Sequence, residues 1–437
     1  MRTIAISNGS VNLFDMKNRS KGCVFIGLSG GVDSAVSATL LKRAGYDITG
    51  VFIKVWQPDW IECTWREDRR DAMRVAAHLG IPFVTLDLEK EYKESVIDYM
   101  IAEYSKGRTP NPDVMCNRTV KFGAFYDWAI AQGADFVATG HYARIVTPAL
   151  SATTAPPSRR KLLAEDCSRL RAGLTRFIYS LLISNDSNKD QSYFLWTLKQ
   201  EQLPRILFPI GHLTKPEVRS LARKFGLPNA EKKDSQGLCF IGKVNIKEFL
   251  SHYMKSEPGN VLDENGEVIG AHPGALFFTI GERHGFTITK KTPHDQPLYV
   301  IDKDVEQNTI TVTALDESGT FPPRANRNPL VGLAPRSAEP AERNGGERES
   351  ESGFNQKVRI EQVNWTEGRA PDEFIGTGKI LEARTRYRQP LEKMRIAGIT
   401  FTDMTVEFER KQATIAPGQS LVIYEGEKCL GGGVISC

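Results

Sequence analysis

A regular alternation of short apolar runs and helical patterns between residues 21 and 142 constrains the fold more than any other feature of this sequence. Four apolar runs predict strands: 23–28, 49–55, 82–88 and 134–139. The stretches between them predict helices, and residues 72–79 carry their apolar side chains at helical spacing. Repeated strand–helix units predict an α/β domain in which helices cover both faces of a parallel sheet.

The rest of the chain is too long to join the same core. With 437 residues the protein should form two or three domains. Helical patterns recur around 192–199 and 215–225, whereas short β-rich runs separated by Gly, Pro and Asp predominate after residue 275. These runs predict a small β-barrel or sandwich with strands at 309–314, 357–365, 378–387, 400–408 and 420–424.

We therefore expect three domains. A parallel-sheet domain should span residues 21–204, a small central domain of helical or mixed structure 205–274, and a C-terminal antiparallel β-barrel 275–437. Two stretches break these patterns. Residues 147–170 are rich in Ala, Thr, Pro and Ser, and we interpret them as a surface insertion; residues 320–353 are rich in Pro, Arg, Glu, Gly and Ser, and predict a flexible loop.

A glycine-rich turn, GLSGGVDS at 27–34, follows the first strand and opens the first helix. Unpaired N–H groups and the positive end of the helix dipole stabilise an anion at such a junction, and adjacent glycines let the backbone approach it. The serines can donate hydroxyl hydrogen bonds, and Asp33 can hold Mg²⁺ against phosphates. The loop contains no Lys and no GxxxxGK[ST] pattern, which argues against ordinary γ-phosphate hydrolysis. The competing interpretation is a plain turn with Asp33 as the helix N-cap.

Seven cysteines are scattered along the chain without a CxxC pair, so a zinc ribbon is not indicated. Cys116 ends the stretch TPNPDVMC, whose two prolines predict a stiff loop before a helix beginning near Lys121. A thiol near a helix N-terminus ionises more easily, but a buried structural cysteine beside a capping Asp fits the pattern equally well. Cys239 follows Lys232 and Lys233, which favour a thiolate, although Leu-Cys-Phe-Ile is also typical of a buried strand.

Together these segments resemble the tRNA-specific 2-thiouridylase family (MnmA type) of the PP-loop ATP pyrophosphatase superfamily. The matching stretches run in order along nearly the whole chain: GLSGGVDS (27–34), GRTPNPDVMCN (107–117), KFG (121–123), ATGHYAR (138–144), NKDQSYFL (188–195), GHLTKPEVR (211–219), KKDSQGLCFIG (232–242), RYRQPL (386–391), PGQ (417–419) and CLGGGVI (429–435). The resemblance implies a tRNA-uridine 2-sulfurtransferase that thiolates the wobble uridine (U34) of tRNA with ATP. It makes the 21–204 domain the catalytic PP-loop domain, with the Cys239 segment packing back on it.

The resemblance also implies roles for individual residues. It implies ATP contacts at Gly27, Leu28, Ser29, Gly30, Gly31, Val32, Asp33, Ser34, Ile53 and Gly140. Many relatives have Met in place of Ile53, a change that a backbone contact would survive. It implies tRNA contacts at Asn111, Pro112, Asp113, His141, Lys189, Asp190, Gln191, Arg386, Tyr387 and Gln419. Mg²⁺ would accompany ATP with Asp33 as a ligand, and no metal site made by the protein alone is expected.

For the chemistry, the resemblance implies that Cys239 carries sulfur as a persulfide and that Cys116 is the partner thiol. Asp113 would assist proton transfer or orient the base. The persulfide would come from a donor protein, and a disulfide bond belongs to the features of the family, although whether Cys116 and Cys239 form one stays open. In the β-rich region Arg384, Arg386 and Arg388 alternate, which predicts three guanidinium groups on one strand face. A solvated outer face fits this pattern, but the resemblance implies that the arginines contact tRNA phosphates.

The sequence favours a cytoplasmic protein without a membrane contact. The N-terminus has no apolar core of a secretory signal, and no apolar run approaches the roughly 20 residues that span a bilayer. The net charge of +4 permits an RNA partner without indicating one. Two alternatives stay open: another PP-loop adenylating synthetase that acts on a small molecule, and a non-catalytic RNA-binding protein with a vestigial nucleotide fold.

Overall fold

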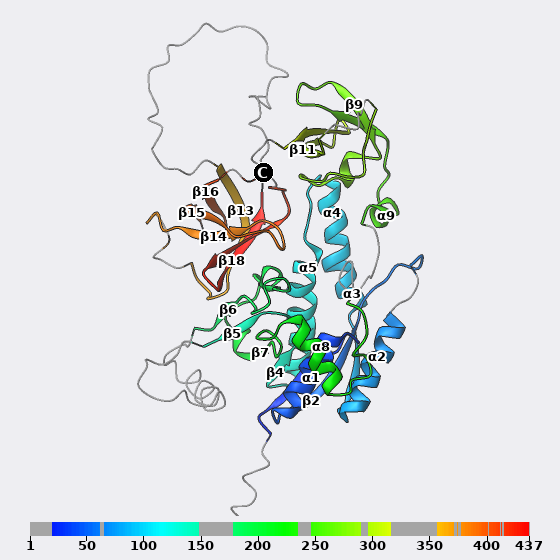
Figure 1. Cartoon of the computed structure of the whole chain (residues 1–437), viewed down its shortest axis with the longest axis vertical. Helices are drawn as coiled ribbons and strands as arrows, with labels where there is room; N and C mark the ends of the chain where they lie inside the picture. The colour runs from blue at the N-terminus through cyan, green and yellow to red at the C-terminus, as the bar shows by residue number, and fades with distance from the viewer. Residues whose placement is uncertain are drawn as a thin grey trace, which may run out of the picture.

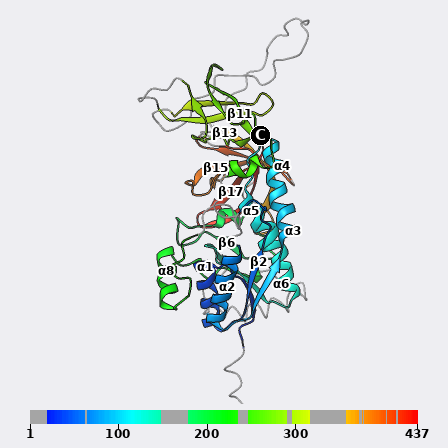
Figure 2. The same cartoon turned by 90° about the vertical axis from the view of Figure 1, so that its right-hand side faces the viewer.

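Three sheets make up the protein, each at a different place along its long axis (Figure 1). The computed structural model describes residues 20–436 with the following exceptions: 62–64, 148–177, 235–245, 290–295, 316–355, 371–373, 375–376, 401, 411 and 413–414. The N-terminal domain lies at one end, the central sheet at the other, and the C-terminal barrel beside the junction between them (Figures 1 and 2). Within the described ranges, no helix is both long enough and apolar enough to cross a membrane.

The N-terminal sheet is parallel throughout, as predicted. Its strands, in spatial order, are β3 (Phe83–Asp87), β2 (Asp47–Lys54), β1 (Cys23–Gly27), β4 (Phe136–Ala138) and β7 (Ile206–Leu207). The chain moves outward in one direction from β1 to β3 and then returns to the other side of β1 with β4. In open α/β sheets the crevice beside such a reversal is where ligands bind.

Helices cover both faces of this sheet because successive strand residues point to opposite sides. Val24 and Ile26 of β1 are buried in one core, against helices α1 (Val32–Arg43), α2 (Trp65–Leu79) and α8 (Lys215–Lys224). The other core lies under a helical run of successive segments: α3 (Glu89–Tyr92), η2 (Lys93–Asp98), α4 (Tyr99–Ser105), α5 (Pro112–Met115), η3 (Cys116–Ala124) and α6 (Phe125–Ala131).

Two helix predictions need correction. The helix expected from Lys121 begins at Pro112, because the Asn111 side chain accepts a hydrogen bond from the Val114 N–H and caps it. The helix expected over 192–199 is only a short 3₁₀ turn, η4 (Ser192–Phe194). The apolar side chains of that stretch do not form one helical stripe, because all of them are buried between the N-terminal domain and the barrel: Tyr193, Leu195, Trp196 and Leu198.

The central sheet has its own small core, which includes Phe278 and Val300. Its strands, in spatial order, are β10 (Thr287–Ile288), β9 (Val268–His272), β8 (Gly259–Leu262), β12 (Thr309–Ala314) and β11 (Leu298–Asp304). Short helices precede β8 (α9, Ile246–Ser251) and follow β9 (η6, Ala275–Phe277). The domain boundary that we placed at residue 274 runs through this sheet, since β10, β11 and β12 lie beyond it.

The C-terminal sheet closes into an antiparallel barrel, because its first strand also pairs with its last. Its strands, in spatial order, are β13 (Gln356–Trp365), β16 (Met404–Phe408), β15 (Glu392–Ile399), β14 (Leu381–Arg384), β17 (Ser420–Glu425) and β18 (Lys428–Ile435). A Cβ on Gly431 of β18 would lie 2.1 Å from the carbonyl oxygen of Asn364 on β13, so closure needs glycine there. Two strands of the N-terminal domain, β5 (Arg144–Val146) and β6 (Ser180–Leu182), extend the sheet beyond β18.

A buried ion pair joins the barrel to the N-terminal domain. Arg384 lies 3.6 Å from the Asp190 carboxylate, and its guanidinium group lies 4.9 Å from the centre of the Tyr424 ring. The predicted face of three alternating arginines is therefore wrong. Strand β14 ends at Arg384, whose side chain is 11% exposed, and the chain then turns, with Arg388 in the left-handed region at φ 64°.

We predict that Arg384→Met destabilises the protein by about 3 kcal/mol, because it leaves the Asp190 charge buried without its cation. The control is Lys379→Met, which breaks a half-exposed ion pair with Glu425 and should cost less than about 1 kcal/mol. The urea midpoint of the first unfolding transition, multiplied by its m value, gives the free energy of unfolding of each variant. Equal shifts for the two variants would show that the buried pair has no special weight.

Candidate active site

The loops that follow β1 and β4 meet at the point where the strand order reverses. A Cβ on Gly140, just after β4, would lie 2.8 Å from the Ser34 nitrogen and 2.9 Å from the Asp33 carbonyl carbon. Only glycine allows the two backbones to approach so closely. The structure thus brings together the 27–34 loop and Gly140, which were predicted to share one ligand.

The 27–34 loop presents the start of α1 without a side-chain cap. Gly31 occupies the N-cap position and forms no side-chain capping bond, so Asp33 lies in the first turn and is not the N-cap of the competing interpretation. The Ser34 hydroxyl donates to the Gly31 carbonyl (3.0 Å) and lies 3.3 Å from the Ser29 hydroxyl. An uncapped helix start with two hydroxyl groups is suited to bind an anion.

The apolar members of the predicted ATP-contacting set face away from this site. Leu28, Val32 and Ile53 have buried side chains in the two cores of the sheet. Ile53 lies near the carboxyl end of β2, beside β1. Only the backbone of these residues can therefore contact a nucleotide.

Asn229 supports the loop from behind, and sequence reasoning missed it. Its side-chain amide donates to the Gly30 carbonyl (2.8 Å). Gly30 also lies close to the backbone of Asp68, because a Cβ on Gly30 would lie 2.3 Å from the Asp68 carbonyl oxygen. Gly30 also has a positive φ of 76°. No local pattern signals this role, because a single Asn after a helix is common.

Lys215 supplies the cation that the loop itself lacks. Its ammonium group lies 2.8 and 2.9 Å from the two carboxylate oxygens of Asp33, and the Tyr142 hydroxyl donates to one of them at 2.9 Å. A capping box between Thr214 and Glu217 starts α8, so Lys215 is the first residue of this helix and lies next to the 27–34 loop. The GHLTKPEVR stretch contained this signal, but the sequence did not indicate where the helix would lie.

Asp234 is a second acceptor for the same lysine. Its carboxylate forms salt bridges with Lys215 (2.8 Å), Lys189 (2.8 Å) and Arg219 (2.6 Å). Burial alone would raise the pKa of the Asp234 carboxyl, but hydrogen bonds from Lys189 and Lys215 outweigh it and hold this pKa well below its usual range. The carboxylate therefore stays ionised at any physiological pH.

The predicted persulfide cysteine, Cys239, lies outside the described residues, within 235–245. The chain that leads to it is fixed by Asp234 and by Lys232, whose ammonium group lies 2.7 Å from both Asp68 and Asp71 on α2. Part of the positive charge that we expected near Cys239 is thus compensated by these carboxylates.

Cys116 lies in the interior of the protein, with no solvent-exposed surface. It lies one turn into the helical run that begins at Pro112, and not in a loop before the helix as predicted. Asn111, Pro112 and Asp113, the residues expected to meet the target base, form the half-exposed start of that run. These three residues precede Cys116 in the sequence by about one helical turn.

Most residues expected to contact tRNA already hold the protein together. Asp190 is buried and accepts hydrogen bonds from the Ser184 and Ser192 backbone. Arg386 donates to the Ile280 carbonyl, Gln419 donates to the Thr109 carbonyl at 3.0 Å, and Tyr387 packs on Phe194. The contacts of Arg386, Gln419 and Tyr387 connect the barrel to the central and N-terminal domains.

His141 is also enclosed. Its ring packs between Phe122 and Phe208, and Nδ1 lies 2.7 Å from the Thr139 hydroxyl. Burial, followed by the charge of Lys121, lowers the pKa of His141 well below its usual value. The imidazole is therefore neutral, and an RNA contact would require it to become exposed.

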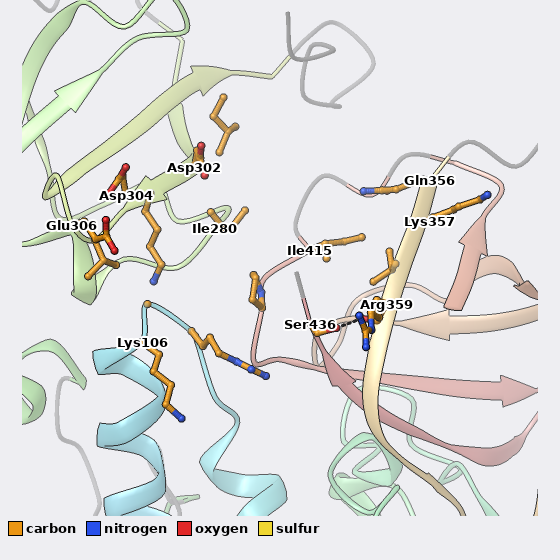
Figure 3. Close-up of a pocket in the computed structure, with 17 residues that line it drawn as sticks. Lys106, Ile280, Asp302, Asp304, Glu306, Gln356, Lys357, Arg359, Ile415 and Ser436 are labelled. Carbon is orange, nitrogen blue, oxygen red and sulfur yellow. Dashed lines mark hydrogen bonds between the residues drawn. The ribbon is translucent and has the colours of Figure 1, made fainter. Parts of the chain in front are cut away.

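A cleft of about 730 Å³ lies elsewhere, between the central sheet, the end of α4 and the barrel (Figure 3). Its walls carry Lys106, Asp302, Asp304 and Arg359 among others, and include none of the predicted site residues. The candidate site is therefore the junction of the two loops, where the chemistry-bearing groups converge, and not this cleft.

We predict that Gly140→Ala abolishes binding of inorganic pyrophosphate, because the added methyl group would push the two loops apart. The control is Gly398→Ala, where a Cβ would meet no atom within 4 Å. Titration calorimetry with pyrophosphate and Mg²⁺ measures the effect, and circular dichroism checks the fold. Unchanged binding by a folded Gly140→Ala protein would place the anion somewhere else.

Three family models match the chain in succession. The model described as tRNA methyl transferase HUP domain matches residues 22–243, and the tRNA methyl transferase PRC-barrel domain matches 247–314. The aminomethyltransferase beta-barrel domain matches 355–435. These matches correspond to the three sheets and, with them, confirm the predicted fold class.

Relatives match over nearly their whole length. A tRNA-specific 2-thiouridylase MnmA from Streptococcus sanguinis is 39% identical over 423 residues, which cover 96% of each chain. Its namesake from Thiobacillus denitrificans is 41% identical over 415 residues, 94% of this chain and 99% of its own. A solved 4-thiouridine synthetase–RNA complex with bound ATP shares 18% identity over 53% of this chain and 50% of its own, and its TM-score of 0.28 is too low to support any argument. The chain belongs to the tRNA-specific 2-thiouridylase family, as its motifs had indicated.

Proposed function

We propose that this chain is a tRNA-uridine 2-sulfurtransferase, which uses ATP to replace the C2 oxygen of the wobble uridine (U34) of tRNA with sulfur. The observation that carries the proposal is the meeting of Asp33, Lys215 and the uncapped start of α1 at the switch point of the sheet. Such a site is suited to a polyphosphate. Relatives that cover the whole chain are named for tRNA 2-thiolation.

ATP and Mg²⁺ fit the residues present. The serine hydroxyls, the first N–H groups of α1 and Lys215 would hold the phosphates, and the backbone of Ile53 and Gly140 would contact the adenosine. Asp33 would provide one carboxylate to a Mg²⁺ ion that phosphate oxygens and water otherwise surround. When bound, the ion would neutralise charge on the departing pyrophosphate.

Adenylation solves the main chemical difficulty, because a urea-like carbonyl oxygen is a poor leaving group. In the proposed reaction the C2 oxygen attacks the α-phosphorus of ATP and pyrophosphate departs. The terminal sulfur of a Cys239 persulfide then attacks C2, and AMP departs with the former C2 oxygen. Finally the Cys116 thiolate attacks Cys239 Sγ, the S–S bond breaks, and the terminal sulfur stays on C2. The product disulfide between the two cysteines must be reduced by a cellular thiol before the next turnover.

The position of Cys116 adds a requirement to this scheme. Because the thiol is buried in the free protein, we propose that the groups covering it move when the uridine enters, among them the start of the helical run at Asn111, Pro112 and Asp113. Asp113 lies one turn before Cys116, and we propose that it orients the base or takes a proton there.

The remaining partners follow from the same chemistry. The persulfide needs a donor protein, either a cysteine desulfurase or a sulfur-relay carrier, and the reaction would take place in the cytoplasm, where tRNA and ATP meet. We propose tRNA contacts at the positions that the family resemblance implied, with a change of partners for those that are enclosed in the free protein: His141, Lys189, Asp190, Gln191, Arg386, Tyr387 and Gln419.

The alternatives explain fewer of these features. A synthetase for a small molecule would use the phosphate loop but would give no role to a barrel tied to the Thr109 loop by Gln419. A methyltransferase, which the names of the family models suggest, would need no phosphate loop. A non-catalytic RNA-binding protein would need neither Lys215 nor Asp33.

We predict that the protein produces 2-thiouridine in tRNA when incubated with ATP, Mg²⁺ and a persulfide donor, and that Cys116→Ser and Cys239→Ser each abolish the product. Cys116→Ser should still accept labelled sulfur on Cys239, whereas Cys239→Ser should accept none there. Both variants should still release pyrophosphate with tRNA, because neither thiol takes part in ATP cleavage. Cys23→Ser, in a half-buried thiol of the same domain, is the control.

Nucleoside analysis of the tRNA and mass spectrometry of the protein report these outcomes. Label on Cys116 in the Cys239→Ser protein, followed by normal turnover, would reverse the roles. Release of pyrophosphate without tRNA would favour the small-molecule synthetase.

A further inference from the structure

Tyr142 connects two parts of the proposed site that are far apart in the sequence. Its hydroxyl donates to Asp33 Oδ1 at 2.9 Å. Its backbone is paired twice with Gln191, because the Tyr142 N–H donates to Gln191 Oε1 (2.9 Å) and the Gln191 N–H donates to the Tyr142 carbonyl (2.8 Å). One residue thus contacts both the phosphate loop and the 189–191 segment.

A second chain of contacts runs in parallel. Lys189 reaches Asp234 at 2.8 Å, Asp234 reaches Lys215 at 2.8 Å, and Lys215 reaches Asp33. The two chains form a closed ring between Asp33 and the 189–191 segment. A change of partner at Lys189 or Gln191 would therefore alter the contacts that hold the Asp33 carboxylate in place.

The two contacts on Asp33 differ in how they respond to a nucleotide. Lys215 is a cation shared between two carboxylates, and the phosphates of ATP would compete for it. The phenol of Tyr142 is neutral and its ring is fixed in the sheet core, where the residue is 2% exposed.

We propose that Tyr142 is a positioning residue for Asp33: it keeps the carboxylate aimed at Mg²⁺–ATP when Lys215 turns to the phosphates, and it makes that aim sensitive to RNA bound at Lys189–Gln191. This inference rests on the proposed function. A hydrogen bond from a neutral donor orients one carboxylate oxygen without cancelling the charge that attracts the cation.

Two variants separate the two halves of the proposal. Tyr142→Phe removes only the hydroxyl, and Gln191→Met removes the acceptor of the Tyr142 N–H while the phenol remains. The probe is a non-hydrolysable ATP analogue with a methylene bridge between the α- and β-phosphates. Its binding is measured by calorimetry over a series of Mg²⁺ concentrations, with and without unmodified tRNA, so the result does not depend on turnover.

Tyr142→Phe should weaken Mg²⁺-dependent binding of the analogue by roughly tenfold, since the lost bond is to a charged group. Without tRNA, Gln191→Met should weaken analogue binding less than Tyr142→Phe does, because the Tyr142 hydroxyl still donates to Asp33. In both variants the factor by which tRNA changes analogue binding should move toward one without reaching it, because the route from Lys189 through Asp234 and Lys215 to Asp33 remains. The analogue should change tRNA binding by the same reduced factor. Tyr104→Phe, in a buried tyrosine of α4 remote from Asp33, is the control for the loss of a core hydroxyl and should leave both quantities unchanged.

If the wild type binds the analogue and Tyr142→Phe shows the same Mg²⁺ dependence, Tyr142 is an ordinary core residue and the proposed function still stands. If Gln191→Met keeps the full effect of tRNA, the connection to the 189–191 segment is wrong. A wild-type protein that does not bind the analogue at all would overturn this inference and the proposed function together.

Discussion

The ion pair between Asp33 and Lys215 joins residues 182 positions apart and fixes the geometry on which the site depends. It holds the start of α8 against the start of α1, and it brings Asp234, the last described residue before the Cys239 segment, next to the phosphate loop. A loop without a lysine thereby gains a cation from another part of the chain. The same pair gives Asp33 a partner in the free protein, which a metal and phosphates would replace.

The domains are connected through groups that we also assign to substrate contact. Arg384 of the barrel neutralises Asp190, and Asp190 neighbours Lys189 and Gln191, which form the ring with Asp33. The barrel shares its sheet with β5 and β6 of the N-terminal domain, so it cannot shift without altering this segment. The RNA contacts that we propose on the barrel side and the nucleotide site that we propose on the sheet side are thus linked by hydrogen bonds and ion pairs between named groups.

Local patterns predicted the parts of the fold that depend on neighbours in sequence. The four parallel strands and the 27–34 loop were found because periodicity and spacing are local properties, whereas Gly140 was named only through the family resemblance. Lys215 and Asn229 were missed since their roles arise only when α8 packs beside the loop. The arginine face failed because alternation assumes a strand that continues, and β14 ends at Arg384. Cys116 was placed before the helix because the Asn111 cap, which starts it earlier, was not recognised.

The central claim is that ATP activates the C2 oxygen of the wobble uridine. The most direct test is to supply tRNA with ¹⁸O at C2 of that uridine and to analyse the AMP released during thiolation by mass spectrometry. Our account predicts one ¹⁸O atom in each AMP, because the former C2 oxygen leaves bonded to the α-phosphorus. AMP without the label, formed together with 2-thiouridine, would contradict it.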